Sequence, residues 1–311
     1  MKVPLVFNGI NADSSYNIFV MKELKQVTVI GLGLLGGSVS LTVLRCFPGV
    51  KAVGFSHRKS TRTKARNLAI ASEITDDIRS SVHGADIVVL STPVLTFEQI
   101  FSRIADALPK GCIVTDVGST KVMPIRWAAQ LLPDSVYYVA SHPVAGSEQR
   151  GIEFARDDLF EQSICILTPT KNTSPAALRT VKMFWSRLGC KVRFMTPAEH
   201  DRVFANVSHL PHITAAALIN SNNGKELKYA GKGFLDTSRI ASGPANVWAD
   251  VLLTNAKNSI RGIDRITQEL AKIKAAIKSN DKKRIEKLLN KARNTRTAVV
   301  RYKMKNKEII P

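Results

Sequence analysis

Short runs of consecutive apolar residues, separated by polar and glycine-rich stretches, mark the first two thirds of the chain. The runs with the length of buried strands are Val27–Ile30, Ala52–Phe55, Ile87–Leu90, Cys112–Asp116, Val136–Ala140 and Ile164–Leu167. Segments with helical periodicity lie among them, at Gly36–Phe47, Ser60–Leu68 and Pro175–Leu188. Apolar strands that alternate with helices are typical of a parallel sheet covered on both faces. The pattern therefore predicts an α/β fold with a doubly wound parallel sheet.

The pattern changes near Pro197, after which no further strand is predicted. The strongest helical segments beyond this point are Ala198–Asn220, Ala245–Arg265 and Asp281–Val300. We therefore expect two domains, one of strands and helices over residues 25–197 and one that is all-helical over residues 198–311. Residues 1–24 are poorly patterned and are expected to form a poorly ordered extension, with Met21 as an alternative start.

The composition fits a protein with a sizeable core, since 44% of the 311 residues are hydrophobic. No apolar run approaches the length that crosses a bilayer, and the first residues do not resemble a secretory signal. The four cysteines lie far apart, without metal-ligand spacing, at Cys46, Cys112, Cys165 and Cys190. We expect reduced thiols and a cytoplasmic location.

A net charge of +20 is the unusual bulk feature, and part of it is local, because lysine and arginine are dense from Lys272 to Lys307. Such a field suits an anionic partner, which could be a nucleic acid, a membrane surface or a small polyanion. No interleaving of aromatic and basic residues accompanies the charge. A solvated basic helix face is therefore the favoured interpretation, and neither a nucleic acid nor a membrane is expected as a partner.

The segment Gly31-Leu32-Gly33-Leu34-Leu35-Gly36 directly follows a predicted strand and opens a predicted helix. In that context, G-x-G-x-x-G is typical of a Rossmann-type dinucleotide site. The first glycine permits a tight turn, the second lets the backbone approach a pyrophosphate, and the third lets the helix pack closely on the strand. The helix N-terminus also favours an anion. We expect these six residues to bind the cofactor, together with Thr92 and Pro93 after the strand Ile87–Leu90.

The end of the second strand bears on the choice between NAD and NADP. NAD-binding versions place an acidic residue there, about twenty residues past the turn, whereas this chain has Ser56 in Gly54-Phe55-Ser56-His57-Arg58-Lys59. A small hydroxyl leaves room for a 2′-phosphate, and Arg58 can pair with that phosphate while Lys59 and Arg62 add positive potential. NADP is therefore favoured, and NAD remains the alternative.

Two further segments carry candidate chemistry beside predicted strands. Asp116-Val117-Gly118-Ser119-Thr120-Lys121 ends one strand, and Ser141-His142-Pro143-Val144-Ala145-Gly146-Ser147-Glu148 follows another. Ligands of doubly wound sheets collect at the carboxyl ends of strands. A histidine at such an edge can accept a proton near neutral pH. On their own, a strand-end turn and a lone histidine are also common as purely structural features.

A third segment, Val207-Ser208-His209-Leu210-Pro211-His212, lies in the helical domain. His209 and His212 are three residues apart and share one helix face if the helix continues through Pro211. No third Cys, Asp or Glu ligand is evident nearby, so no metal is predicted.

Taken together, these segments resemble the prephenate and arogenate dehydrogenases of tyrosine biosynthesis. The resemblance spans about Val27 to Asn255 and includes Gly233-Phe234-Leu235-Asp236-Thr237-Ser238-Arg239-Ile240-Ala241, followed by Pro244 and Trp248-Ala249-Asp250. It implies an oxidative decarboxylation, in which a hydride passes from C4 of a cyclohexadienol to C4 of the nicotinamide. The ring then loses CO₂ and becomes aromatic. Prephenate would give 4-hydroxyphenylpyruvate, and arogenate would give tyrosine.

The resemblance also implies roles for individual residues. His142 matches the catalytic histidine, which must be neutral to accept the proton of the C4 hydroxyl, and Ser119 matches a serine that contacts the same hydroxyl. Arg239 matches the arginine that binds a substrate carboxylate. The remaining residues that match pocket positions are His209, His212, Glu148, Asp236 and Trp248. The family's helical domain pairs with a copy of itself, which implies a homodimer.

Two departures from the family pattern stand out: Ser56 replaces the acidic residue of NAD-preferring members, and Gly243 stands where a more polar residue is expected. Prephenate is the favoured substrate, with arogenate as the alternative, because Glu148 could pair with the ammonium group of arogenate. A different two-domain dehydrogenase would share the glycine turn without needing His142 and the segment from His209 to Arg239 together. A non-catalytic protein that binds nucleic acid through its basic tail is the weakest alternative.

Overall fold

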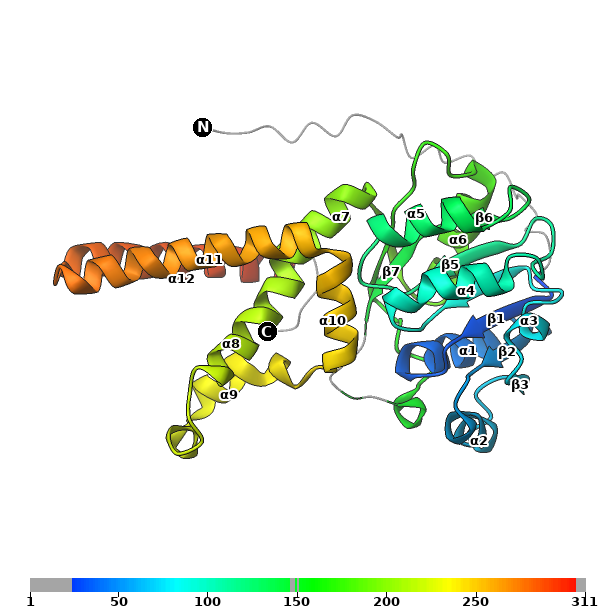
Figure 1. The fold of residues 1–311 in the computed structure, drawn as a ribbon, viewed down its shortest axis with the longest axis horizontal. Helices are drawn as coiled ribbons and strands as arrows, with labels where there is room; N and C mark the ends of the chain where they lie inside the picture. The colour runs from blue at the N-terminus through cyan, green and yellow to red at the C-terminus, as the bar shows by residue number, and fades with distance from the viewer. Residues whose placement is uncertain (1–23, 146–148, 150, 306–311) are drawn as a thin grey trace.

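The computed structural model describes residues 24–145, 149 and 151–305. These residues form a sheet domain and a set of helices, and two of the helices project from the rest of the molecule as a hairpin (Figure 1). The predicted N-terminal extension and Glu148 lie outside the described residues. Among the helices of the described ranges, none is long and apolar enough to span a membrane.

The main sheet has six parallel strands in the order β3-β2-β1-β4-β5-β6. Their bounds are β1 (Gln26–Ile30), β2 (Lys51–Phe55), β3 (Glu73–Thr75), β4 (Ile87–Leu90), β5 (Ile113–Asp116) and β6 (Tyr137–Tyr138). The strands β2 and β3 are added on one side of β1, and β4, β5 and β6 on the other side. The carboxyl ends of the neighbours β1 and β4 therefore flank the position where such sheets bind ligands. This order confirms the predicted doubly wound parallel sheet.

Alternate residues of β4 enter two separate hydrophobic cores. Ile87 and Val89 pack on one face, in the core to which α1 (Leu34–Cys46) and α6 (Pro175–Arg187) contribute. Val88 and Leu90 pack on the other face, with α4 (Phe97–Ile104) and α5 (Val122–Leu131). Ala65 of α2 (Lys59–Asn67) lies in the first core, and Ile78 of α3 (Ile78–Ser81) lies in the second. Every β4 side chain is therefore removed from water, which explains its uninterrupted apolar sequence.

A second sheet of three strands differs from the prediction. It consists of β7 (Ser141–Val144), β8 (Ile164–Leu167) and β9 (Lys191–Phe194), with β7 antiparallel and β9 parallel to β8. Within the predicted strand Val136–Ala140, Tyr137–Tyr138 continues the parallel series as β6. The prediction that Ile164–Leu167 belongs to the same series is wrong, because these residues pair in the second sheet as β8. The main sheet ends at Tyr138, and the chain then crosses into the second sheet as β7. Pro143 fits β7 because an edge strand tolerates a residue without an N–H group.

The helical part starts with α7 (Pro197–Phe204), which runs through a π-helical turn at Ala205–His209 into α8 (Leu210–Asn220). The other helices in the described part of the chain are α9 (Lys232–Ser238), α10 (Ala245–Thr254), α11 (Ala256–Lys278) and α12 (Lys282–Lys305). The helix predicted over Ala245–Arg265 is divided at Asn255, whose φ of −126° is not helical. The helices α11 and α12 form the projecting hairpin (Figure 1).

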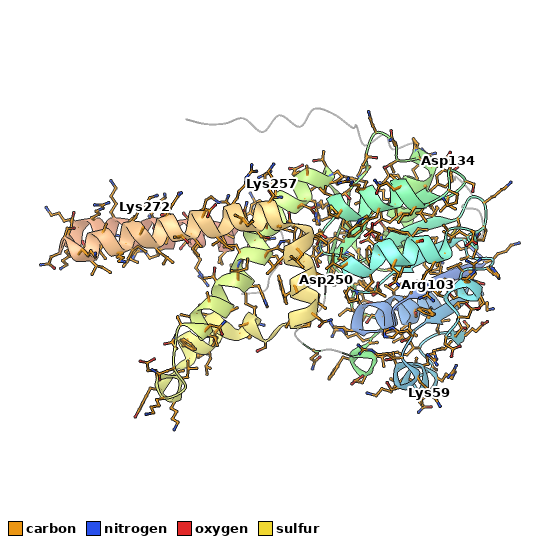
Figure 2. All side chains as sticks on the ribbon, viewed as in Figure 1. Lys59, Arg103, Asp134, Asp250, Lys257 and Lys272 are labelled. Atoms are coloured by element: carbon orange, nitrogen blue, oxygen red, sulfur yellow. The ribbon has the colours of Figure 1, made fainter. Side chains whose placement is uncertain are left out.

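Direct hydrogen bonds join the two parts of the molecule. Asp250 on α10 accepts a hydrogen bond of 3.1 Å from the backbone N–H of Leu95, and Figure 2 labels Asp250 where the helices meet the sheet domain. The hydroxyl oxygens of Thr120 and Thr254 are 2.9 Å apart and buried. The cofactor edge of the sheet and the helical part are therefore in direct contact.

Candidate active site

The glycine turn has the geometry that its sequence predicts. Gly31 has a φ of +103°, and a Cβ added there would lie 2.7 Å from the Ser91 carbonyl oxygen. A Cβ at Gly36 would lie 1.9 Å from the carbonyl oxygen of Gly31. A side chain at either position would therefore force the backbone apart.

Gly33 differs from these two glycines, because a Cβ there would meet nothing within 4 Å. Gly33 is the N-cap of α1, and no side chain caps the start of that helix. The first backbone N–H groups of a helix attract anions. An open approach over Gly33 to this helix start fits the pyrophosphate of a dinucleotide.

The end of β2 has a small buried hydroxyl and a nearby cation. Ser56 is 6% exposed, and its Oγ accepts a hydrogen bond of 3.3 Å from the backbone N–H of Arg58. The guanidinium of Arg62 donates to the carbonyls of Ser56 and His57 and pairs with Asp76 at 2.7 Å. The Asp76 carboxylate offsets the positive potential that Arg62 was expected to add. Arg58 and Lys59 are then the exposed cations beside Ser56.

Thr92 and Pro93 follow β4 directly, beside the glycine turn. A Cβ added at Gly31 would lie only 2.7 Å from the methyl carbon of Thr92. Its hydroxyl oxygen is 2.7 Å from that of Thr96, which fixes the side chain. Both residues are half-buried at the edge where the cofactor is expected.

A pocket of about 420 Å³ lies between the second sheet, the loop after β5 and the π-helical turn. Ser119 and His142, the two predicted catalytic residues, both line it. The other lining residues are Val144, Ala145, Phe204, Val207 and Ser208. Segments far apart in the sequence therefore bring the predicted catalytic pair to one cavity.

A fully buried ion pair holds the two strand ends that carry Ser119 and His142. The Nζ of Lys121 donates to Asp116 Oδ1 and, at 2.6 Å, to the carbonyl oxygen of Ser141. Asp116 also accepts hydrogen bonds from Gly118 N at 2.7 Å and from Tyr138 Oη at 2.7 Å. Charges buried this completely need several such partners to offset the cost of desolvation.

His142 does not stand alone. Its Nδ1 lies 2.9 Å from Nε2 of His200, and Nδ1 of His200 lies 2.9 Å from Oδ1 of Asp201. Burial, followed by the proximity of His200, Lys121 and His209, holds the pKa of His142 well below its usual value. The imidazole is therefore neutral at physiological pH, as a proton acceptor must be.

His200 and Asp201 belong to the site but are not among the residues predicted from the sequence. Both are buried, and His200 contacts His142 of the pocket. They lie in the first turns of α7, where Thr196 caps the helix and Pro197 begins it. A His-Asp pair directly after a domain boundary was the available signal. The sequence alone does not indicate that this helix end faces His142.

His209 and His212 lie on opposite sides of the junction between the π-helical turn and α8. Both are buried, and each has a ring nitrogen without a hydrogen-bond partner, Nε2 in His209 and Nδ1 in His212. Burial lowers the pKa of His209 to about 4 and also lowers the pKa of His212. Buried polar atoms without partners are rare in proteins, and they fit groups that await a ligand.

Trp248 lies flat against the ring of His212, with centroids 3.7 Å apart and planes 8° apart. A Cβ on Gly243 would come within 2.4 Å of the Trp248 Nε1 and 3.0 Å of the His212 Cε1. The glycine that departs from the family pattern is therefore required by the position of Trp248 in this chain.

Arg239 and Asp236 are exposed and are not part of the lining of the pocket around His142. Arg239 begins a short 3₁₀ turn, Arg239–Ser242, and the carbonyl of Ile240 in that turn accepts a hydrogen bond from His212. Glu148 lies outside the described residues. In the part of the chain that the structure describes, no cluster of His, Cys, Asp and Glu has the form of a metal site.

The sheet order, the glycine turn and the neutral histidine define a nucleotide-binding domain joined to a helical domain that helps to form a polar pocket. Residues 40–194 match a family model described as "Prephenate dehydrogenase, nucleotide-binding domain", and residues 196–291 match "Prephenate dehydrogenase, dimerization domain". The chain belongs to the prephenate dehydrogenase family.

Curated relatives and solved structures agree with this membership. The cyclohexadienyl dehydrogenase of Zymomonas mobilis is 33% identical over 84% of this chain and 91% of its own length. The prephenate dehydrogenase of Bacillus subtilis is 31% identical over 89% of this chain and 76% of its own. The A. aeolicus prephenate dehydrogenase, solved with hydroxyphenyl propionate and NAD⁺, is 32% identical with a TM-score of 0.83, covering 89% of this chain and 98% of that one. Synechocystis arogenate dehydrogenase is 30% identical with a TM-score of 0.74, covering 88% and 99%.

Gly33 and Gly36 should respond differently to substitution by alanine. Gly36→Ala should lower the free energy of unfolding by about 2–4 kcal/mol, because its methyl group meets backbone. Gly33→Ala should leave the thermal midpoint unchanged but weaken cofactor binding about tenfold, since its methyl group occupies the open approach. Thermal unfolding and fluorescence titration with the dinucleotide measure the two effects. A stable Gly36→Ala with an unstable Gly33→Ala would contradict these assignments.

Proposed function

We propose that this chain catalyses the NAD(P)-dependent oxidative decarboxylation of prephenate to 4-hydroxyphenylpyruvate. The observation that carries the proposal is the position of a neutral His142 beside Ser119 in one pocket, joined to a sheet edge with an open glycine turn. When bound, the nicotinamide supplies the hydride acceptor. The chain's own residues then have to orient the substrate, accept one proton and exclude water.

In the proposed reaction, His142 accepts the proton of the C4 hydroxyl while the hydride leaves the same carbon. The bond to the ring carboxylate then breaks and CO₂ leaves. The bonding electrons complete the aromatic ring as a phenolate, which takes the proton back from His142 to give the phenol. Ser119, which lines the same pocket, is proposed to contact the same hydroxyl. Because aromatisation drives the reaction, the protein mainly supplies orientation and one base.

Substrate recognition is proposed to come from the helical part. His209 and His212 offer buried polar atoms to the substrate, and Arg239 suits a carboxylate because its guanidinium can donate two parallel hydrogen bonds. Trp248, which stacks on His212, is proposed as a pocket wall, and Glu148 and Asp236 stay predictions from the family resemblance. Arogenate, which differs only in carrying an ammonium group in place of a keto group, is the second candidate, supported by the similarity to the Synechocystis arogenate dehydrogenase.

NADP is proposed as the preferred cofactor. Ser56 leaves space at the end of β2, and Arg58 is an exposed cation two residues away. The A. aeolicus relative was solved with NAD⁺, so the preference depends on these residues of this chain. Gly31, Leu32, Gly33, Leu34, Leu35, Gly36, Thr92 and Pro93 are the other proposed contacts.

A two-domain organisation and a homodimer complete the proposal, with residues 25–197 binding the dinucleotide and residues 198–311 binding substrate and pairing. Ile263, Leu270 and Ile277 recur every seven residues along α11 and are 40%, 60% and 61% exposed. An apolar stripe of this kind favours a helical partner. The helix α12 carries ten basic residues and one acidic residue, so it repels its own copy and the α11 stripe is the better contact.

A panel of two substrates and two cofactors tests the reaction and the cofactor preference. We expect a higher kcat/KM for prephenate than for arogenate, and for NADP than for NAD. Arg58→Ala should lower kcat/KM with NADP about tenfold, because one phosphate contact is lost, and change it little with NAD. Lys51→Ala, at the other end of β2 from Ser56, is the control. A strong preference for NAD in the unaltered protein contradicts the NADP assignment.

His142→Asn should lower kcat by about 10²–10⁴ while the dinucleotide still binds, because the variant lacks the proton acceptor. The exposed His83→Asn is the control. In the unaltered protein, kcat/KM should fall on the acid side only below the usual histidine range, since the lowered pKa of His142 keeps the ring neutral until then. Unchanged turnover in His142→Asn, or an acid limb above pH 6.5, would refute the role.

Sedimentation at micromolar concentration should give a dimer. Leu270→Lys should shift the protein toward monomer, because it places a charge in the apolar stripe. Gln268→Lys, on another face of α11, should leave the dimer intact. A monomer in the unaltered protein, or equal behaviour of the two variants, would contradict the proposed contact.

A further inference from the structure

We propose that His200, held by Asp201, is a positioning residue that fixes which ring nitrogen of His142 carries the proton. The inference rests on the proposed role of His142 as the proton acceptor. A neutral imidazole carries a proton on one nitrogen only, so His142 can act as a base toward the pocket only if the nitrogen facing the pocket is the unprotonated one.

The arrangement starts at Asp201, which is 1% exposed. Its Oδ1 accepts the backbone N–H of Lys121 at 2.8 Å, and its Oδ2 accepts that of Val122 at 3.0 Å. Both carboxylate oxygens therefore act as acceptors, and a carboxylate has no hydrogen to donate. The hydrogen bond of 2.9 Å between Asp201 Oδ1 and Nδ1 of His200 must therefore be donated by His200.

His200 is 0% exposed. Burial, the largest effect, lowers the pKa of His200 against the opposing effect of Asp201. In the neutral ring the proton lies on Nδ1, so Nε2 has a free lone pair. The contact of 2.9 Å between His200 Nε2 and His142 Nδ1 is then a hydrogen bond that His142 donates. The proton of His142 is thereby placed on Nδ1, and its Nε2 keeps the lone pair that accepts the substrate proton.

Aromatic packing fixes the ring planes on which this order depends. Phe204 stacks on His200, with ring centroids 4.5 Å apart and planes 23° apart. Its ring centroid also lies 4.7 Å from that of His142. Asn255 donates a hydrogen bond of 2.7 Å to the backbone carbonyl of Asp201. The residue that sets the tautomer thus belongs to α7 of the helical part, whereas the base belongs to β7 of the sheet domain.

Two substitutions of His200 separate tautomer control from packing. His200→Phe keeps a ring against Phe204 but removes the acceptor, so it should lower kcat about 10²-fold with KM for substrate and cofactor nearly unchanged. His200→Gln offers an amide oxygen to His142 Nδ1 and an amide N–H to Asp201, so it should recover most of that loss. The exposed His83→Phe is the control. A purely structural role predicts altered stability without this difference in kcat between the two variants.

Nitrogen-15 NMR of the histidine rings gives a readout that does not depend on turnover. With the His142 signals assigned by their loss in His142→Asn, the unaltered protein should show Nδ1 protonated and Nε2 unprotonated. His200→Phe should shift His142 toward a mixture of the two tautomers. A protonated Nε2 in the unaltered protein overturns the proposal even if the variants fail to fold. If prephenate and arogenate are not oxidised but the tautomer is as stated, the proposed function fails while the positioning role stands.

Discussion

The buried ion pair between Asp116 and Lys121 is the interaction on which the site depends. Both side chains are completely removed from water, and an ionised pair there is stable only if its remaining hydrogen-bonding capacity is filled. The fold fills it from several directions, with the hydroxyl of Tyr138 and the backbone N–H groups of Gly118 and Ser141 on the carboxylate. The ammonium group in turn holds the Ser141 carbonyl. One pair of charges thus fixes the loop of Ser119 against the strand of His142.

Asp201 serves the same geometry from the helical part. Its two oxygens accept the backbone N–H groups of Lys121, the N-cap of α5, and of Val122, the first residue of that helix. A carboxylate at this end of a helix is favourable, because the free N–H groups carry partial positive charge. The same carboxylate orients His200. The contact that satisfies a helix end therefore also ties the two parts of the chain together at the pocket.

The sequence predicts the strands that are buried on both faces, such as Ile87–Leu90, because nothing polar interrupts them. It does not predict β9, whose residues Lys191–Phe194 are half-buried or exposed, or the division into two sheets, which depends on a crossing after Tyr138. The break at Asn255 is not predicted because the apolar spacing continues across it. Its cause is the side chain of Asn255, which turns inward to Asp201 and His209. Ser119 and His142 could be named from motifs, whereas His200 and Asp201 acquire meaning only from the packing of α7 against β7.

The close fit of Gly243, Trp248 and His212 has an evolutionary consequence. The indole cannot yield to a new Cβ at Gly243, because its other contact is a ring stacked 3.7 Å away. A lineage carrying Trp248 in this position can accept a polar residue at Gly243 only after the indole has moved or been replaced. The effect of a mutation at one position is therefore conditional on the residue at the other, and the two sites should change together between relatives rather than one at a time.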